Sequence, residues 1–242
     1  FGADYKGSGT GTNNTMDFVT IASTGDAADF GDLTTQRSGN QPMQNATRGI
    51  FAGGRAHPSG NSVDVVDYIT IASTGDAVDF GDLNVSARTG TSACSPTRGV
   101  ISRGNPSTNR IEYFTISTLG NGADFGDATT VDAGAVGTSS NAVRGINWTS
   151  SYAPNTDDVI DYITIATLGN AILFGELAHI SYNGAACCAS RTRSVVGGGF
   201  DGGIAEEMEY VQIMTAGNAI DFGDLSQARS EPGAASNGHG GL

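Results

Sequence analysis

Acidic residues recur at three positions of a repeated segment, and carboxylates can serve general acid–base catalysis or bind calcium. The first position precedes an aromatic residue: Asp17, Asp67, Glu112, Asp161 and Glu209. The second precedes a phenylalanine (Asp29, Asp79, Asp124 and Asp221), and the third follows Phe-Gly (Asp32, Asp82, Asp127, Glu176 and Asp224). Catalysis requires one asymmetric constellation, whereas these residues occur about once per repeat. We therefore predict that they are structural and that the protein is not an enzyme.

An arginine recurs in a second repeated segment, at Arg48, Arg98, Arg144 and Arg193. Arginine can bind a carboxylate through two parallel N–H···O bonds, which also satisfies polar groups at strand ends. We predict that these arginines are the structural counter-ions of the repeated acidic residues, between packed sheets.

Histidines and cysteines do not form a known metal or nucleophile motif. The three histidines lie in different sequence contexts, without HxH or HExxH spacing: His57, His179 and His239. The three cysteines are expected to be small buried apolar residues: Cys94, Cys187 and Cys188. The sequence contains no GxSxG or P-loop motif. We expect no metal, no cofactor and no catalytic residue.

The segment that positions the acidic residues is Asp67 to Leu83, DYITIASTGDAVDFGDL, which returns from Asp17, Glu112, Asp161 and Glu209. Its first half alternates, with Ile69 and Ile71 on one face, and both faces are largely apolar. This pattern predicts a strand in a sheet that is covered on both sides. Gly75-Asp76 predicts a two-residue hairpin turn. The second strand carries a phenylalanine that we expect to be buried in every copy: Phe30, Phe80, Phe125, Phe174 and Phe222.

The number and spacing of these copies predict the architecture. Successive phenylalanines lie 50, 45, 49 and 48 residues apart. Each unit is expected to contribute a small-residue strand such as Thr91–Cys94, a strand such as Arg98–Ser102, and the two strands of the hairpin. Four antiparallel strands repeated five times are typical of a five-bladed β-propeller. We predict an all-β fold in which residues 1–242 form a single domain.

The two ends of the chain are predicted to complete one blade together. The segment Asn45 to Phe51, NATRGIF, has counterparts in the next three units. The C-terminus ends Asn237 to Leu242, NGHGGL, and Phe1 supplies the next residue that this pattern requires. Pairing of the N- and C-terminal segments would close the ring, whereas an open solenoid more naturally ends in whole polar repeats.

The order of these features resembles a kelch motif. A small-residue strand is followed by Arg-Gly, an apolar strand that ends in Gly-Gly (Gly53-Gly54 and Gly198-Gly199), an acidic-Tyr strand, and aromatic-Gly-Asp-Leu. The repeat is more closely similar to the kelch-like repeats of virion structural proteins of marine cyanophages, and the resemblance covers essentially the whole chain. It implies a propeller that serves in a phage particle or another secreted assembly.

Charge and hydropathy narrow the possible partners. The net charge of −13 repels phosphate backbones, so nucleic acid is not expected as a partner. No apolar run approaches the roughly 18 to 20 residues of a membrane span. The first residue is Phe1 rather than Met, and we expect the chain to be a processed product or a piece of a longer protein.

The connections between the second and third strands of each unit differ in length and content, and alternation of strand direction predicts that they share one face. This face is expected to display aromatic and polar side chains: Tyr5, Lys6, Arg55, His57, Arg103, Arg110, Trp148, Tyr152 and Phe200. Such side chains on scaffolded loops can bind glycans or protein epitopes. The alternative is that the loops vary because no packing restrains them. Two functions follow: a recognition module for a glycan, a host surface or a protein, and a purely structural virion protein without a ligand of its own.

Overall fold

The computed structural model describes residues 14–102, 104–132, 137–149, 158–179, 184–200, 203–230 and 232–236. Within these ranges the chain forms 20 strands and no helix, so the prediction of an all-β fold is confirmed. The part of the chain that is described accordingly offers no long apolar helix that could cross a membrane.

Four antiparallel sheets of four strands make up most of the fold, and each corresponds to one sequence repeat. Unit 2 contains β4 (Gln41–Gln44), β5 (Arg48–Ala52), β7 (Val65–Thr70) and β8 (Val78–Asp82). Unit 3 contains β9 (Thr91–Cys94), β10 (Arg98–Ser102), β11 (Thr108–Thr115) and β12 (Ala123–Asp132). Unit 4 contains β13 (Gly137–Ser140), β14 (Arg144–Trp148), β15 (Val159–Thr164) and β16 (Ile172–Glu176). Unit 5 contains β17 (Ala186–Ala189), β18 (Arg193–Gly197), β19 (Glu207–Gln212) and β20 (Ile220–Asp224).

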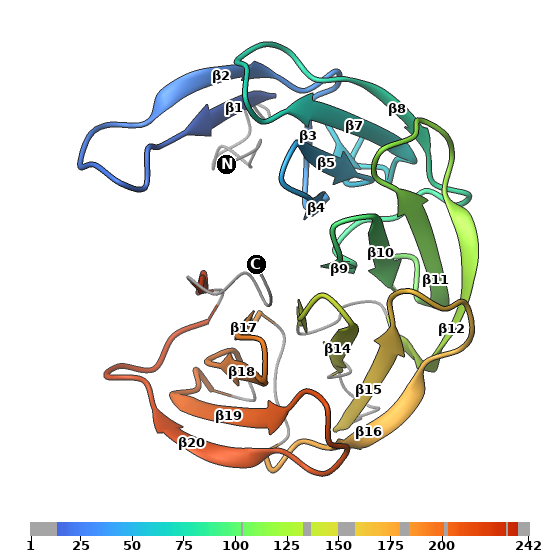
Figure 1. Ribbon diagram of the computed structural model, residues 1–242. Helices are drawn as coiled ribbons and strands as arrows, with labels where there is room; N and C mark the ends of the chain where they lie inside the picture. Colours follow the sequence, from blue (N-terminus) through green and yellow to red (C-terminus); the bar gives the residue numbers. More distant parts are fainter. Residues whose placement is uncertain are drawn as a thin grey trace.

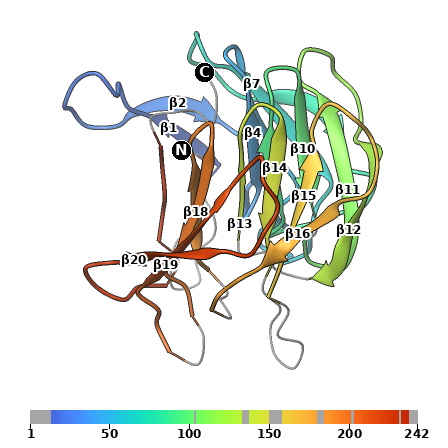
Figure 2. The same cartoon turned by 60° about the horizontal axis from the view of Figure 1, so that its bottom comes forward.

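Two smaller sheets complete the described structure. Unit 1 is the hairpin of the first repeat, β1 (Thr15–Phe18) and β2 (Ala28–Asp32). The short strands β3 (Arg37–Ser38) and β6 (Arg55–Ala56) pair with each other on the connections of unit 2. Figure 1 shows the units in sequence order along an arc around a common centre, with β4, β9 and β17 on its inner side and β8, β12, β16 and β20 on its outer side. In Figure 2, β1–β2 and β19–β20 are the two ends of this arc.

Neighbouring units are joined by one repeated set of backbone bonds, which we call the inter-unit contact. The Gly75 N–H donates to the Phe30 carbonyl (2.7 Å) and the Ala77 N–H to the Asp32 carbonyl (2.8 Å). Asp76 Oδ1 accepts from the Asp32 N–H (3.0 Å). The same three bonds recur around Gly120-Asn121, Gly169-Asn170 and Gly217-Asn218. The hairpin of each unit therefore holds the outer strand of the unit before it.

The prediction of a two-residue hairpin turn at Gly75-Asp76 is wrong. The chain reverses earlier, where the Ser73 N–H donates to the Thr70 carbonyl (3.2 Å), and β8 begins only at Val78. Gly-Asp instead makes the inter-unit contact. A local turn and this contact look alike in sequence, because a glycine followed by a short polar side chain that binds backbone N–H groups suits both.

A glycine on each outer strand allows neighbouring units to approach this closely. Gly81 has a φ of +145°, and a Cβ at this position would lie 2.6 Å from the carbonyl carbon of Gly120. The same arrangement brings Gly126 against Gly169 at 2.5 Å. The glycine of the repeated Phe-Gly-Asp motif is therefore required by packing between units.

The repeated phenylalanines lie in the core next to these glycines. Phe80, Phe125 and Phe174 are only 2–3% exposed, and each meets the tyrosine of its own unit edge to face, as Tyr68 meets Phe80 at 5.9 Å between ring centres. Burial of one such ring contributes roughly 1.5 to 3 kcal/mol. Core clusters also span neighbouring units, since Phe114 of unit 3 belongs to the cluster built on unit 2.

The two ends of the arc differ from the internal junctions. Phe222 is 46% exposed, so the prediction that this phenylalanine is buried in every copy is wrong for unit 5, whereas its four counterparts are at most 9% exposed. Among the described residues, nothing lies within 4 Å of the place that a Cβ would take on Gly223. The segments predicted to close the ring, Phe1 and Asn237 to Leu242, lie outside the described ranges. The described residues therefore form four complete inter-unit contacts along an open arc.

Candidate binding face

We call the loop face the side of the sheets that carries the loops between the second and third strands of each unit. In unit 2, pairing of β3 with β6 places the connection that enters the unit beside the loop between its second and third strands. In unit 3, Arg88 and Asn105 form the equivalent bridge, with backbone bonds of 3.1 and 2.8 Å. The Ser62 hydroxyl donates to the Asn105 carbonyl (3.0 Å), which joins the loops of the two units.

The predicted ligand-binding residues divide into four groups. Arg55 is exposed, with its Nε donating to the Gly60 carbonyl (3.2 Å), and Phe200 is half exposed. His57 is half-buried and precedes a cis peptide bond to Pro58. The predictions for four further residues lie outside the described ranges: Tyr5, Lys6, Arg103 and Tyr152. Arg110 and Trp148 make defined contacts, which are described below.

Trp148 is not on the loop face, and its prediction as a ligand-binding residue is wrong. The side chain is fully buried in the cluster between units 4 and 5, and its Nε1–H donates to Ser194 Oγ (2.9 Å). Strand β14 extends to Trp148, which pairs with Ile160 on β15, one residue beyond the boundary assumed from the sequence. From sequence alone, a tryptophan at the end of a short strand is easily assigned to the following loop, because its packing partner on the next unit is not known.

The acidic residues that precede an aromatic residue are buried structural groups in units 2 to 5. Asp67 and Asp161 are not exposed at all, and Glu112 and Glu209 are at most 5% exposed. Each accepts a backbone N–H from the segment that follows the Phe-Gly-acidic motif of the preceding unit, at 3.0 to 3.2 Å: Thr34 to Asp67, Asn84 to Glu112, Thr129 to Asp161 and Ala178 to Glu209. The second acidic position is local, since Asp29 Oδ1 accepts from the Gly31 N–H (3.1 Å).

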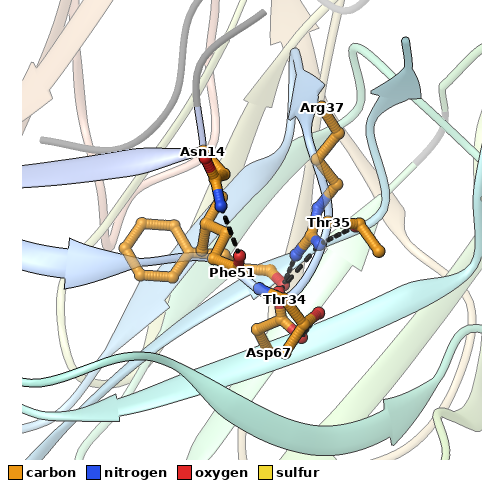
Figure 3. Close-up of polar contacts among 7 residues, drawn as sticks. Asn14, Thr34, Thr35, Arg37, Phe51 and Asp67 are labelled. Carbon is orange, nitrogen blue, oxygen red and sulfur yellow. Dashed lines mark hydrogen bonds and ion pairs between the residues drawn. The ribbon is translucent and has the colours of Figure 1, made fainter. Parts of the chain in front are cut away.

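A second partner of each buried carboxylate differs from unit to unit. In unit 2, Arg37 Nη1 donates to Asp67 at 2.8 Å, and neither side chain is exposed (Figure 3). In the other units the partner is Arg110 (3.1 Å to Glu112), Asn147 (2.8 Å to Asp161) and His179 (2.8 Å to Glu209). Sequence reasoning missed Arg37, because it occurs in one repeat only and lies 30 positions from its partner.

The repeated arginines are not the counter-ions of these acids, so that prediction is wrong. Each stacks on the tyrosine of its own unit, with 4.3 to 4.8 Å between the guanidinium carbon and the ring centre: Arg48 on Tyr68, Arg98 on Tyr113, Arg144 on Tyr162 and Arg193 on Tyr210. Arg48 Nη1 also donates to the Ile116 carbonyl of the next unit (2.9 Å), and Arg98 and Arg144 repeat this bond. Arginine forms such cation–π contacts readily. These arginines therefore have a structural role, as predicted, but their partners are tyrosine rings and backbone carbonyls instead of carboxylates.

A cavity of about 240 Å³ opens on the loop face of unit 3. Leu83, Val85 and Ala87 of the entering connection form one side, and Ile101 of β10 and Pro106 contribute further apolar surface. Arg110 and Glu112 of β11 supply its charged groups. The Glu112 side chain is 6% exposed, whereas that of Arg110 is 40% exposed, so the arginine reaches the carboxylate from the solvent side.

The Cys187 thiol is not an activated nucleophile. Burial raises the pKa of the Cys187 thiol, and repulsion from the neighbouring Cys188 adds to this shift, so the thiol stays protonated and is a poor nucleophile. All three cysteines are free and partly buried. Over the residues with described positions, no three His, Cys, Asp or Glu side chains come together as a metal site.

Comparison with known proteins adds no family assignment. A scan against protein-family models finds no match for the chain, and a search of curated proteins finds no relative.

Proposed function

We propose that the chain is a closed five-bladed, kelch-like β-propeller that acts as a non-catalytic recognition module, in a phage particle or another secreted assembly. Two features support the ring. Four units have the same strand order and the same inter-unit contact, and unit 1 supplies the outer hairpin of a fifth blade. In units 2 to 5 the strand that corresponds to β1 pairs with an inner strand, so the described part of unit 1 is two strands short of a whole blade.

The surroundings of unit 1 favour closure by the two ends of the chain. A cavity of about 650 Å³ lies between unit 1 and the inner strands of unit 2, lined by apolar side chains that include Phe18, Met43 and Ile69. Near the C-terminus, Ser236 Oγ donates to the Ala189 carbonyl of unit 5 (2.7 Å), as Ser140 Oγ donates to the Cys94 carbonyl at the junction of units 3 and 4 (3.4 Å). The chain thus reaches the place where the inner strands of a fifth blade would begin.

Closure predicts that Gly223→Ala is as destabilising as Gly81→Ala. Alanine at Gly81 meets the backbone of the next unit as well as the strain of its positive φ, and we expect a loss of about 2–5 kcal/mol in the free energy of unfolding. Gly223 occupies the same position in unit 5. In a closed ring it faces Gly25 of unit 1, and its replacement carries both penalties. Urea unfolding followed by circular dichroism measures all variants.

Gly75→Ala is the matched control for backbone strain alone. Gly75 has a φ of +151°, but a Cβ there has open space around it. If Gly223→Ala costs no more than Gly75→Ala, unit 5 does not pack on unit 1 and the ring is open. If it costs as much as Gly81→Ala, the fifth junction exists.

The cavity on the loop face is the observation that carries the recognition function. It combines an apolar wall with a carboxylate that is almost completely buried, next to loops that differ between units. Binding sites typically combine apolar surface with a few placed polar groups. The acidic net charge of −13 fits a ligand that is not itself an anion.

The test is a screen of the full chain against a glycan array, host-surface extracts and proteins of the parent particle. The double variant Val85→Ser/Ser107→Ala changes two exposed loop-face side chains that line the cavity, without opening the core. We expect it to weaken binding at least tenfold. The control, Ile172→Ser/Leu173→Ser, changes exposed positions on the outer strand β16 and should leave loop-face binding unchanged.

A purely structural role in a particle is the second candidate, and the outer rim favours it. Large apolar side chains on the outer strands are more than half exposed: Val78, Ile172, Leu173 and Ile220. Exposed apolar patches on a protein surface often mark contacts with neighbouring subunits. If the β16 variant abolishes association with particle proteins while the loop-face variant does not, this role replaces recognition.

A further inference from the structure

The cavity of unit 3 corresponds, position for position, to a site that is filled in unit 2. The connections that enter the two units have the same length, from Leu33 to Arg37 and from Leu83 to Ala87. Both begin with a backbone N–H that binds the buried carboxylate of the unit, Thr34 to Asp67 and Asn84 to Glu112. The two connections therefore correspond residue by residue, and Ala87 occupies the position that Arg37 has in unit 2.

In unit 2 the Arg37 guanidinium has three partners (Figure 3). Its Nη1 donates to Thr35 Oγ1 and to Asp67 Oδ2, both at 2.8 Å, and its Nη2 donates to the Phe51 carbonyl at 3.0 Å. The counterparts of these residues in unit 3 are Val85, Glu112 and Ile101, and all three line the cavity. The replacement of Arg37 by Ala87 thus leaves space around a carboxylate that a guanidinium occupies in the neighbouring unit.

Size and charge both fit one basic side chain. A cavity of about 240 Å³ is smaller than typical sites for drug-sized ligands, and its walls are apolar as the stem of an arginine requires. An ionised carboxylate offers about four acceptor positions. Glu112 receives one backbone N–H and one bond from Arg110, whereas Asp67 receives three bonds from Thr34 and Arg37.

Arg110 is the internal competitor for this site. It makes one 3.1 Å bond to Glu112, and its side chain is 40% exposed, unlike the fully buried Arg37. A partly exposed ion pair of this kind contributes little to stability and can be displaced. A guanidinium that enters the cavity would take over Glu112 and release Arg110 into solvent.

We propose that the cavity of unit 3 binds the guanidinium group of an arginine side chain from a protein partner, with Glu112 as its anionic acceptor. This inference rests on the recognition function of the loop face and names its ligand class. A free guanidino compound shares the same chemistry, so the two sources are separated in the experiment.

The experiment titrates the full chain with three probes and follows binding by calorimetry and NMR. The probes are N-acetyl-arginine N-methylamide, agmatine, and a short arginine-containing peptide, and the matching citrulline compounds serve as neutral controls. We expect the arginine probes to bind and the citrulline compounds to bind at least tenfold more weakly. Tighter binding of the peptide than of agmatine identifies a protein side chain as the ligand, and the reverse order identifies a small guanidino compound and overturns the protein-partner assignment.

Two substitutions make the assignment falsifiable. Ala87→Arg places an arginine where unit 2 has Arg37, and it should weaken binding of the arginine probes at least tenfold without loss of folding. Val78→Arg adds the same charge at an exposed site and should leave the affinity for the probes unchanged. Arg110→Ala removes the competitor and should tighten binding several-fold. Weaker binding to Arg110→Ala, or equal binding of citrulline compounds, would overturn the proposal. Absence of arginine binding alongside positive glycan or host-surface binding would refute this inference and leave the recognition function standing.

Discussion

Asp67→Asn is expected to lower the free energy of unfolding by about 3–5 kcal/mol, because it leaves the guanidinium of Arg37 buried without a charged partner. Both side chains are fully buried, and the carboxylate also accepts from the N–H and hydroxyl of Thr34. Asparagine keeps the shape of the side chain and one acceptor, so the loss reports the missing charge. Urea unfolding followed by circular dichroism is the measurement.

Two comparisons define this result. Asp79→Asn changes an exposed acidic residue of the same repeat and should stay within about 0.5 kcal/mol of the parent. The double variant Arg37→Ala/Asp67→Asn should lower the free energy of unfolding by less than the sum of its two single variants. Each single change leaves one buried charge without its partner, whereas the double variant removes both charges. Additive losses would show that Arg37 and Asp67 are energetically independent, contrary to the 2.8 Å contact.

Trp148→Ala is expected to destabilise the protein by about 3–5 kcal/mol, the range for loss of a large buried aromatic side chain. The indole is fully buried between units 4 and 5 and packs with Ile146, Ile160 and Val196. Circular dichroism is again the suitable probe, because Trp148 is the single tryptophan of the chain and its removal abolishes tryptophan fluorescence.

The matched control for Trp148 is Phe200→Ala, on the loop face. Phe200 is 50% exposed, and its loss should change stability by only about 0.5 kcal/mol. Trp148→Phe keeps most of the apolar surface and removes the N–H bond to Ser194, with an expected cost of about 1–2 kcal/mol. A Trp148→Ala variant as stable as the parent would contradict the burial of this side chain.

The strands of this protein could be predicted from its sequence because the same alternating pattern returns at intervals of 45 to 50 residues. Repetition averages out local ambiguity, and the boundaries of β9 and β10 were predicted to the residue. Contacts between units were not predictable in the same way. Gly-Asp suits a tight turn and an inter-unit contact equally well, and only the position of the Phe30 carbonyl distinguishes the two.

The candidate site was less predictable than the fold. Arg110 was recognised as a loop-face residue, but the pattern of repeated arginines led to the wrong partner for the acids. The partners of the buried carboxylates come from four different positions, so no periodic signal marks them. A usable signal does exist, namely the alignment of Arg37 with Ala87 in two connections of equal length.

The inter-unit contact is made mostly by backbone atoms, and this affects how the protein could be engineered. Two of its three bonds join main-chain atoms, and the third uses the oxygen of one short amide or carboxylate side chain. All three are made by the hairpin of each unit. The loops on the opposite ends of the strands contribute nothing to these bonds. Apart from the loops that Ser62 and Asn105 join, these loops could therefore be exchanged or randomised as a combinatorial library, with the sheets kept intact as a display scaffold.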